Sequence, residues 1–184
     1  MKKQGMKWQV KGTRVLLEHP RLRVVEDDLI LPSGEDISWL RYEKQQDFVV
    51  VLALKDKSIL LIRHYNHPLE DYLYEFPCGV IDESESILAA AKRELFEETG
   101  VRAEKLERIG QFVANPRRSA LRGNVVVARE LTQYGAELEL GEQIEPVWFP
   151  IAEFEAALSQ GLEMSADALA AWALYRNSLQ TTFD

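Results

Sequence analysis

The chain has 184 residues, of which 46% are apolar and 28% are charged, and its 30 acidic against 22 basic residues give a formal net charge of -8. This length fits about one domain, and the apolar fraction is typical of a globular protein rather than a disordered one. The acidic balance disfavours capture of nucleic acid through the overall field, which needs many lysines and arginines to neutralise phosphates. Any anionic ligand must therefore be bound by local groups.

Two further features narrow the class of protein. The longest uninterrupted apolar run, residues 48–54, is far shorter than the roughly 18 residues that a membrane helix needs. The single cysteine, Cys78, excludes an intramolecular disulfide and a zinc site with several cysteines. We therefore expect a cytoplasmic, soluble protein that does not bind a membrane.

The first part of the chain predicts an antiparallel β hairpin. Residues 21–31 and 35–42 are rich in β-forming side chains, and they flank a turn in which Pro32 and Gly34 supply the required backbone angles. The next two runs, 48–54 and 59–65, are almost continuously aliphatic, which is typical of strands buried on both faces.

A further short strand is expected at residues 72–76, before Pro77, where we expect a loop because proline cannot donate to a ladder. From Ser84 to Thr99 the apolar residues follow a helical period, and Gly100 is placed as a left-handed cap. Later strands are expected at about 106–113, 125–128 and 147–149, and helices at 151–159 and 166–177. Strands on both sides of a helix, with helices at the end, predict an α/β or α+β domain whose mixed sheet is covered on both faces.

Three glutamates lie on one side of the predicted helix. Glu94, Glu97 and Glu98 are three and four residues apart, so they repel one another close to the negative end of the helix dipole. Arg93 can pair with Glu97 but does not neutralise the group. Mg²⁺ would do so, because it binds one or two carboxylates together with waters and phosphate oxygens. The alternative is that the glutamates simply form a solvated helix face.

The surrounding residues form a longer pattern. It reads Gly79, five residues, Glu85, seven residues, Arg93-Glu94-Leu95, one residue, Glu97-Glu98, one residue, Gly100-Val101. This is the complete signature of the Nudix hydrolases, and the chain resembles that family from about residue 48 to residue 154. The resemblance implies a Nudix-type α/β/α sandwich with a mixed sheet at residues 46–184, with the signature at 79–101, preceded by an N-terminal antiparallel β region at 1–45.

The resemblance also implies the metal ligands. Glu94 and Glu98 would be the principal ligands of Mg²⁺, or of Mn²⁺ in its place, and Glu97 would be a shared ligand or would orient the attacking water. We expect Gly79 to let the backbone turn sharply, so that the carbonyl of Cys78 faces the metal. The bound metal would polarise a phosphoanhydride and lower the pKa of a bound water.

Glu85 is expected near the start of the helix, where the dipole favours an acid. In the family, the glutamate at this place pairs with the arginine of the signature, here Arg93. This pair would be structural.

Features outside the signature resemble the branch of ADP-ribose pyrophosphatases and nucleoside diphosphate sugar hydrolases. Glu75, followed after two residues by Cys78-Gly79, is similar to the approach of that branch, which has alanine in place of the cysteine. Pro116 lies where the branch has its marker proline. The N-terminal hairpin is also typical of the branch, where it helps to build a homodimer and to contact the base of the substrate.

The chain departs from this branch at two places. The marker proline is followed by Arg117 and Arg118 instead of glycine and a later glutamate, and Arg63 is followed three residues later by Asn66 instead of a second arginine. Arg117 or Arg118 can supply the missing diphosphate contact, because guanidinium groups bind phosphate through two hydrogen bonds.

Trp39 matches the position of a base-stacking aromatic side chain in some relatives. Packing in the core or in a dimer interface is an equal alternative for this residue.

The catalytic base is expected from a late loop rich in glutamate. Glu142 and Glu145 are our candidates because they precede the strand at 147–149, while Glu137 and Glu139 are further acids of the same segment. Attack by a metal-bound water with a carboxylate as base would release a nucleoside monophosphate and a sugar phosphate.

We therefore expect hydrolysis of ADP-ribose or of a related nucleotide sugar such as GDP-mannose. The alternatives are a dinucleoside polyphosphate or capped-RNA pyrophosphatase, against which Pro116 and the hairpin argue, and a non-catalytic nucleotide-sensing module, against which the intact signature argues. A nucleophilic Cys78 paired with His64 or His67 is disfavoured because Cys78 lies at the alanine position of the signature and the histidines lie in a proline-containing loop. A zinc site on the two histidines is disfavoured because they are three residues apart with no further His or Cys partner. The expected partners are the nucleotide sugar and a second copy of the chain, but not nucleic acid.

Overall fold

The computed structural model describes residues 7–43, 45–135 and 143–180. The chain forms two compact units. The first unit comprises Met1–Gln45 and Asn115–Leu121, and the second comprises Gln46–Ala114 and Arg122–Asp184.

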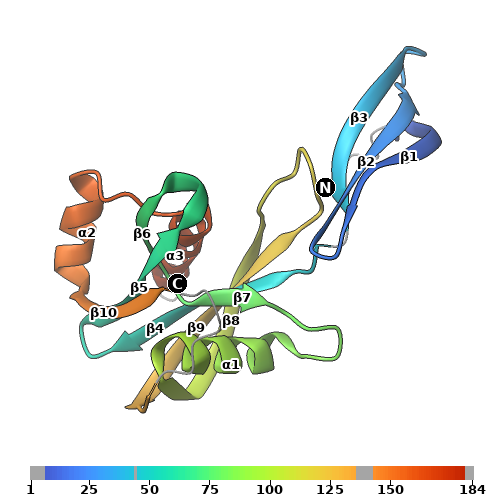
Figure 1. Ribbon diagram of the computed structural model, residues 1–184. Helices are drawn as coiled ribbons and strands as arrows, with labels where there is room; N and C mark the ends of the chain where they lie inside the picture. The colour runs from blue at the N-terminus through green and yellow to red at the C-terminus, as the bar shows by residue number, and fades with distance from the viewer. Residues whose placement is uncertain (1–6, 44, 136–142, 181–184) are drawn as a thin grey trace. The chain divides into compact units, whose positions relative to one another are not determined.

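The first unit is built around a three-stranded antiparallel sheet (Figure 1). Its strands, in the order β1-β2-β3, are β1 (Gln9–His19), β2 (Leu22–Ile30) and β3 (Asp36–Glu43). The expected hairpin between β2 and β3 is confirmed, with Gly34 at φ 94° in the turn and a hydrogen bond from Leu31 N to Glu35 O of 2.9 Å. Strand β1 was not expected from the sequence, and nearly all of its residues are exposed.

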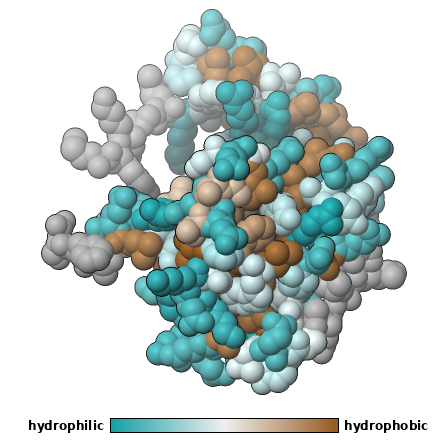
Figure 2. Space-filling view, turned by 90° about the vertical axis from the view of Figure 1, so that its left-hand side faces the viewer, coloured by the Kyte–Doolittle hydropathy of each residue, from teal (hydrophilic) through white to brown (hydrophobic). Residues whose placement is uncertain are grey.

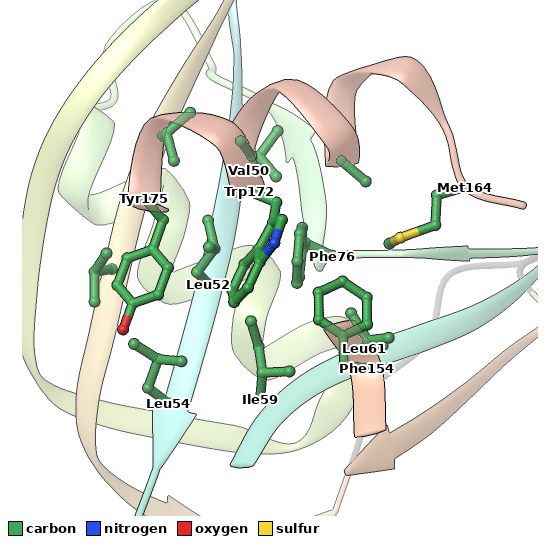
Figure 3. Close-up of a cluster of buried hydrophobic side chains, with 14 residues drawn as sticks. Val50, Leu52, Leu54, Ile59, Leu61, Phe76, Phe154, Met164, Trp172 and Tyr175 are labelled. Atoms are coloured by element: carbon green, nitrogen blue, oxygen red, sulfur yellow. The ribbon is translucent and has the colours of Figure 1, made fainter. Parts of the chain in front are cut away.

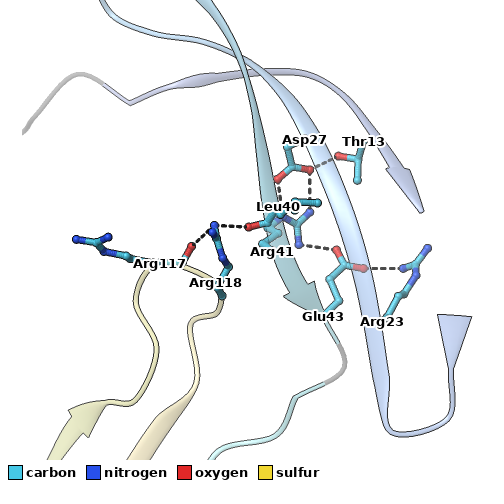
Figure 4. A network of polar contacts seen from close by, with 8 residues as sticks. All are labelled: Thr13, Arg23, Asp27, Leu40, Arg41, Glu43, Arg117 and Arg118. Atoms are coloured by element: carbon cyan, nitrogen blue, oxygen red, sulfur yellow. Dashed lines mark hydrogen bonds and ion pairs between the residues drawn. The ribbon is translucent and has the colours of Figure 1, made fainter. Parts of the chain in front are cut away.

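A buried carboxylate joins the three strands of this sheet. Asp27 of β2 is 5% exposed and accepts hydrogen bonds from Thr13 Oγ1 at 2.6 Å and from Arg41 Nε at 2.5 Å (Figure 4). Arg41 also donates to Glu43 at 2.6 Å. The Arg41 guanidinium holds the pKa of Asp27 below its usual value, against the opposing effect of burial.

We expect Asp27→Asn to weaken the first unit by about 1–2 kcal/mol, because the amide accepts fewer hydrogen bonds and removes a carboxylate that pairs with the half-buried Arg41. Hydrogen–deuterium exchange of the β2 and β3 amides measures this change locally. The control is Asp28→Asn, since Asp28 is the exposed neighbour on the same strand. Equal protection in the two variants would contradict the role assigned to Asp27.

The second unit contains a seven-stranded mixed sheet with the order β10-β5-β4-β9-β8, in which β6 pairs with β5 and β7 pairs with β4. Strands β4 and β9 run parallel, and the other pairs are antiparallel. The strands are β4 (Phe48–Lys55), β5 (Ser58–Asn66), β6 (Asp71–Glu75), β7 (Cys78–Val80), β8 (Val101–Val113), β9 (Arg122–Gln133) and β10 (Ile144–Pro150). The helices are α1 (Ile87–Thr99), α2 (Ile151–Ser159) and α3 (Ala166–Gln180), with a short 3-10 turn, η1 (His67–Leu69).

Both faces of this sheet are buried. On one face Val49 and Val51 of β4 pack with Leu95 of α1. On the other face the alternate β4 residues pack with Phe154 of α2 and Trp172 of α3, whose rings lie 5.0 Å apart (Figure 3). The α/β/α sandwich expected from the sequence is thus confirmed, and the continuous aliphatic run of β4 is explained by its burial on both sides.

The expected bounds hold for some elements and not for others. Helix α1 begins at Ile87, three residues later than expected, with the Ser86 hydroxyl accepting from Ala89 N at 3.2 Å, and it ends at Gly100 with φ 69° as expected. The observed β8 and β9 are longer than expected because they continue as an antiparallel ribbon with many charged, exposed residues. The loop expected after Pro77 is wrong, since the chain forms β7 there.

The hydrophobic residues on the surface and the lengths of the helices can be compared with what a membrane-spanning protein needs. On the face shown in Figure 2, hydrophobic residues lie in small groups among hydrophilic ones. The longest described helix, α3, has 15 residues, and none of the helices in the described ranges has the length and apolar character needed to cross a membrane.

Candidate functional site

Glu94 and Glu98 lie on the side of α1 that packs against β7, and Glu97 shares the guanidinium of Arg93 with Glu94. Glu98 is 4% exposed, and its Oε2 accepts a hydrogen bond from the backbone N–H of Cys78 at 3.0 Å. The Glu94 side chain is 13% exposed and lies against Gly79. Helix spacing therefore brings these carboxylates to the Cys78-Gly79 segment.

Gly79 serves a different purpose from the one expected. It lies in β7 opposite Val49, and its φ is outside the left-handed region, so the expectation of a sharp turn at this residue is wrong. A Cβ atom added at Gly79 would lie 2.0 Å from the Glu94 Cδ and 2.0 Å from its Oε1. Glycine is needed because the carboxylate occupies the space that any other side chain would fill.

The backbone of Cys78 faces the same carboxylates. Its N–H is donated to Glu98, while the adjoining hydrogen bond to β4 is made by Val51 N and Pro77 O at 2.8 Å. In an extended strand the N–H and C=O of one residue leave on the same side, so the Cys78 carbonyl is also on the side of Glu98.

The thiol of Cys78 packs against the apolar core. Burial, together with the nearby charge of Glu98, raises its pKa well above the usual value. An uncharged thiol is a poor nucleophile, which argues against covalent chemistry at this residue.

Arg93 connects the loop before α1 to the glutamates of the helix. Its Nη2 donates to Glu85 Oε2 at 2.8 Å and to Val80 O at 2.9 Å, and its Nη1 donates to Glu94 at 2.7 Å and Glu97 at 3.0 Å. The hydrogen bond from Arg93 holds the pKa of Glu85 below its usual value, and these acids raise the pKa of Arg93. The side chain thus offsets part of the repulsion within the site.

We expect Glu85→Gln to lower the melting temperature at neutral pH, by about 2–4 °C for each kcal/mol lost. Because the folded-state pKa of Glu85 lies below its usual 4.5, the ionised carboxylate stabilises the fold above pH 4.5. The difference in melting temperature between Glu85→Gln and the unmodified chain should therefore vanish as the pH falls through the lowered folded-state pKa of Glu85. Thermal unfolding across this range measures it, with Glu83→Gln as the exposed control; a difference independent of pH would contradict the assignment.

Two candidate substrate contacts, Glu75 and Arg63, lie on the paired strands β6 and β5. Glu75 of β6 has its Oε2 3.2 Å from Nδ1 of His64 on the neighbouring β5. The Arg63 guanidinium lies 4.0 Å from the centre of the Tyr72 ring and 3.6 Å from the carboxylate of Glu145. Glu145 is one of the two candidate bases. It lies on β10 opposite Arg63, and its side chain is 67% exposed.

Glu142, with Glu137 and Glu139, lies outside the described residues.

Asp167 is an acid that the sequence did not single out. It lies in the first turn of α3, and burial and the charge of Glu75 raise its pKa. It also contributes to the charge around Cys78. Only the packing of α3 against the sheet brings it near Glu75, so the sequence pattern contains no signal for it.

The other three predicted substrate contacts, Trp39, Arg117 and Arg118, belong to the first unit. The Arg118 guanidinium lies 5.7 Å from the centre of the Trp39 ring, and its Nη1 donates to Leu40 O at 3.2 Å and to Arg117 O at 3.4 Å (Figure 4). Trp8 packs edge-on against Trp39 at 5.6 Å. Trp39, Leu40, Arg117 and Arg118 border a hollow of about 460 Å³. Arg118 thus fixes the loop to β3, whereas Arg117 is exposed.

The donors of the second unit suit a hard divalent cation. Glu94, Glu97 and Glu98 offer carboxylate oxygens and Cys78 offers a carbonyl, and the cradle at Gly79 holds the Glu94 carboxylate at the strand. In the described ranges, no three His, Cys, Asp or Glu side chains converge on one metal position, since the carboxylates are directed at Arg93 and at the Cys78 N–H. Carboxylate and carbonyl oxygens are the donor type that hard divalent cations prefer.

Comparisons with known proteins bear on the family of the chain and on its fold. The chain is 34% identical over 117 residues to an ADP-ribose pyrophosphatase of Bacillus subtilis (strain 168), covering 63% of each chain, and 33% identical over 107 residues to the ADP compounds hydrolase NudE of Escherichia coli (strain K12), covering 58% of each. The chain thus spans about 58–63% of the length of these two curated relatives. A crystal structure of an ADP compounds hydrolase superposes with a TM-score of 0.89 at 26% identity and covers 99% of both chains. The model of the NUDIX domain matches residues 43–172, most of the sequence, and the chain therefore belongs to the Nudix family.

Proposed function

We propose that the chain is a divalent-metal-dependent Nudix pyrophosphohydrolase that cleaves the pyrophosphate bond of nucleoside diphosphate sugars, with ADP-ribose as the first substrate to test. The observation that carries the proposal is the placement of Glu94 and Glu98 at the Cys78-Gly79 segment, with Glu97 linked to Glu94 through Arg93, within a NUDIX domain. The names of the two relatives, an ADP-ribose pyrophosphatase and an ADP compounds hydrolase, support an ADP-linked substrate. The products would be a nucleoside monophosphate and a sugar phosphate.

The signature residues of the second unit have different roles in the proposed reaction. Glu94 and Glu98, with the carbonyl of Cys78, would hold the cation, and Glu97 would share it or orient the attacking water. Bound there, Mg²⁺ or Mn²⁺ supplies Lewis acidity and lowers the pKa of a coordinated water. Arg93, fixed by Glu85, keeps the carboxylates in place before the substrate binds.

A carboxylate near the start of β10 is assigned as the general base that accepts the proton of the attacking water. Glu142 and Glu145 are the candidates. Arg63 lies 3.6 Å from Glu145 and is assigned to the diphosphate, with Glu75 as a further substrate contact. An exposed Glu145 is able to reorient when substrate occupies Arg63.

The first unit is proposed to contact the base of the substrate and to form a homodimer. Trp39 offers an aromatic ring beside a cation, a combination that stacks on nucleobases. Arg117 is the arginine assigned to phosphate, since Arg118 is already engaged by two carbonyls. A location in the cytoplasm fits a chain whose one cysteine forms no intramolecular disulfide.

A panel of nucleotide sugars that includes ADP-ribose and GDP-mannose tests the proposal, with Mg²⁺ or Mn²⁺ and product identification by mass. We expect the paired masses of a nucleoside monophosphate and a sugar phosphate, and no products with a chelator. Cleavage confined to dinucleoside polyphosphates or capped RNA would overturn the assigned substrate class. Metal and nucleotide binding without any cleavage would instead indicate a sensing module.

A further inference from the structure

The second unit has an open hollow with both polar and apolar lining at the N-terminal end of α1, apart from the glutamates described above. Its volume is about 520 Å³. Residues from the loop before α1 and from the ends of β4, β8 and β9 surround it: Gln46, Asp47, Ile81, Glu83, Ile87, Arg108, Gln111 and Asn124.

An arginine is fixed at this hollow by two neutral amides. Arg108 Nε donates to Asn124 Oδ1 at 3.0 Å, and its Nη2 donates to Gln111 Oε1 at 2.6 Å. Asn124 is 3% exposed and is held in turn by a hydrogen bond from its Nδ2 to Phe48 O at 3.3 Å. These partners set the direction of the guanidinium without neutralising its charge. A buried polar residue that holds an exposed arginine is typical of a prepared binding group.

The other groups at the hollow indicate the chemistry of the ligand. Asp47 and Glu83 add two carboxylates to the one cation of Arg108, so the charge of the lining is negative and disfavours a phosphate. Donors and acceptors of hydrogen bonds are both present, and Ile81 and Ile87 provide an apolar patch beside them. A ligand with several hydroxyl groups and a face of C–H bonds matches this combination, because each hydroxyl both donates and accepts.

The hollow lies at the N-terminal end of α1, the same helix that carries the signature glutamates. Ile87 at its rim begins the helix, and Glu94 follows seven residues later, or roughly 10 Å along the axis. The loop that borders the hollow continues from β7 and includes Glu85, the partner of Arg93 (Figure 1). This separation is on the scale of a diphosphate and one sugar.

We infer that this hollow is the subsite for the distal sugar of the nucleotide sugar and that Arg108 is its specificity-determining residue. The inference rests on the proposed function, since it concerns the substrate of that same reaction. Arg108 donates to a sugar hydroxyl, Asp47 and Glu83 accept from others, and the isoleucines pack on the C–H face.

The test compares two substrates that share the same nucleoside diphosphate. One is the nucleotide sugar that the chain cleaves, and the other is the methyl ester of the same nucleoside diphosphate, which has no sugar hydroxyls at its distal end. We expect Arg108→Gln to raise KM for the nucleotide sugar at least about tenfold with kcat little changed, and to leave the kinetics of the methyl ester unchanged. Arg129→Gln, at an exposed position on β9, is the matched control and should change neither substrate.

The outcomes separate the inference from the proposed function. An unchanged KM for the nucleotide sugar, or an equal loss with the methyl ester, would overturn the sugar subsite and leave the hydrolase standing. Absence of cleavage of any nucleotide sugar by the unmodified chain would overturn the proposed function itself. If Arg108→Gln lowers the melting temperature, Gln111→Ala at its exposed position gives the same comparison with Asn124 still paired.

Discussion

Glu98→Gln is expected to reduce turnover of ADP-ribose at least about a thousandfold while the fold remains intact. The amide is nearly the same size as the carboxylate, and its oxygen still accepts from the Cys78 N–H, so the 4% exposed position stays filled. It lacks the negative charge that a divalent cation needs from this ligand. Activity should fall while the melting temperature changes little.

Initial rates with saturating Mg²⁺, together with thermal unfolding, measure both parts of this expectation. Glu104→Gln serves as the matched control, because Glu104 is an exposed glutamate on β8 and its replacement should leave the rate unchanged. Retention of most of the activity by Glu98→Gln would remove Glu98 from the metal site. A large drop in melting temperature would instead show a structural role.

Gly79→Ala is expected to lower turnover about a hundredfold at little cost in stability. The new Cβ would lie 2.0 Å from the Glu94 Cδ, so the carboxylate has to move. Because this carboxylate is the end of a flexible side chain, it can rotate away, and alanine is otherwise acceptable in an extended strand. The substitution is therefore expected to displace the proposed metal ligand Glu94 without altering the sheet.

A double-mutant cycle identifies Glu94 as the group that is displaced. If Gly79→Ala acts through Glu94, combining it with Glu94→Gln should cost much less than the product of the two single effects. The control is Gly12→Ala, another strand glycine, where an added Cβ has no neighbour within 4 Å. Multiplicative effects of the two substitutions would show that Gly79 acts through some other contact.

Local patterns predicted a mixed sheet covered on both faces and the glutamate helix, because each of them depends on sequence neighbours, and the resemblance to the Nudix family implied the α/β/α sandwich. The continuous aliphatic run of β4 reflects burial on both faces, and Gly100 ends α1 through its own φ of 69°. The spacing of Glu94 and Glu98 follows from the helix repeat. These features need no knowledge of the tertiary fold.

The features that were missed or wrongly explained depend on contacts between distant segments. Strand β1 has few buried residues, so it shows no alternation of apolar and polar side chains that predicts a strand. The role of Gly79 depends on the approach of Glu94 from another element, and the place of Asp167 depends on the packing of α3. Similarly, a sequence cannot show that Arg118 is engaged by the carbonyl of Leu40 and so differs from its neighbour Arg117.

Hydrolysis of ADP-ribose in water enriched in oxygen-18, with and without a chelator, is the most direct test of a metal-assisted attack by water at the glutamates of α1. We predict one labelled oxygen in one of the two monophosphate products, formation of both products only with Mg²⁺ or Mn²⁺, and neither product from Glu98→Gln. Unchanged product formation with the chelator, or by Glu98→Gln, would contradict the proposed site.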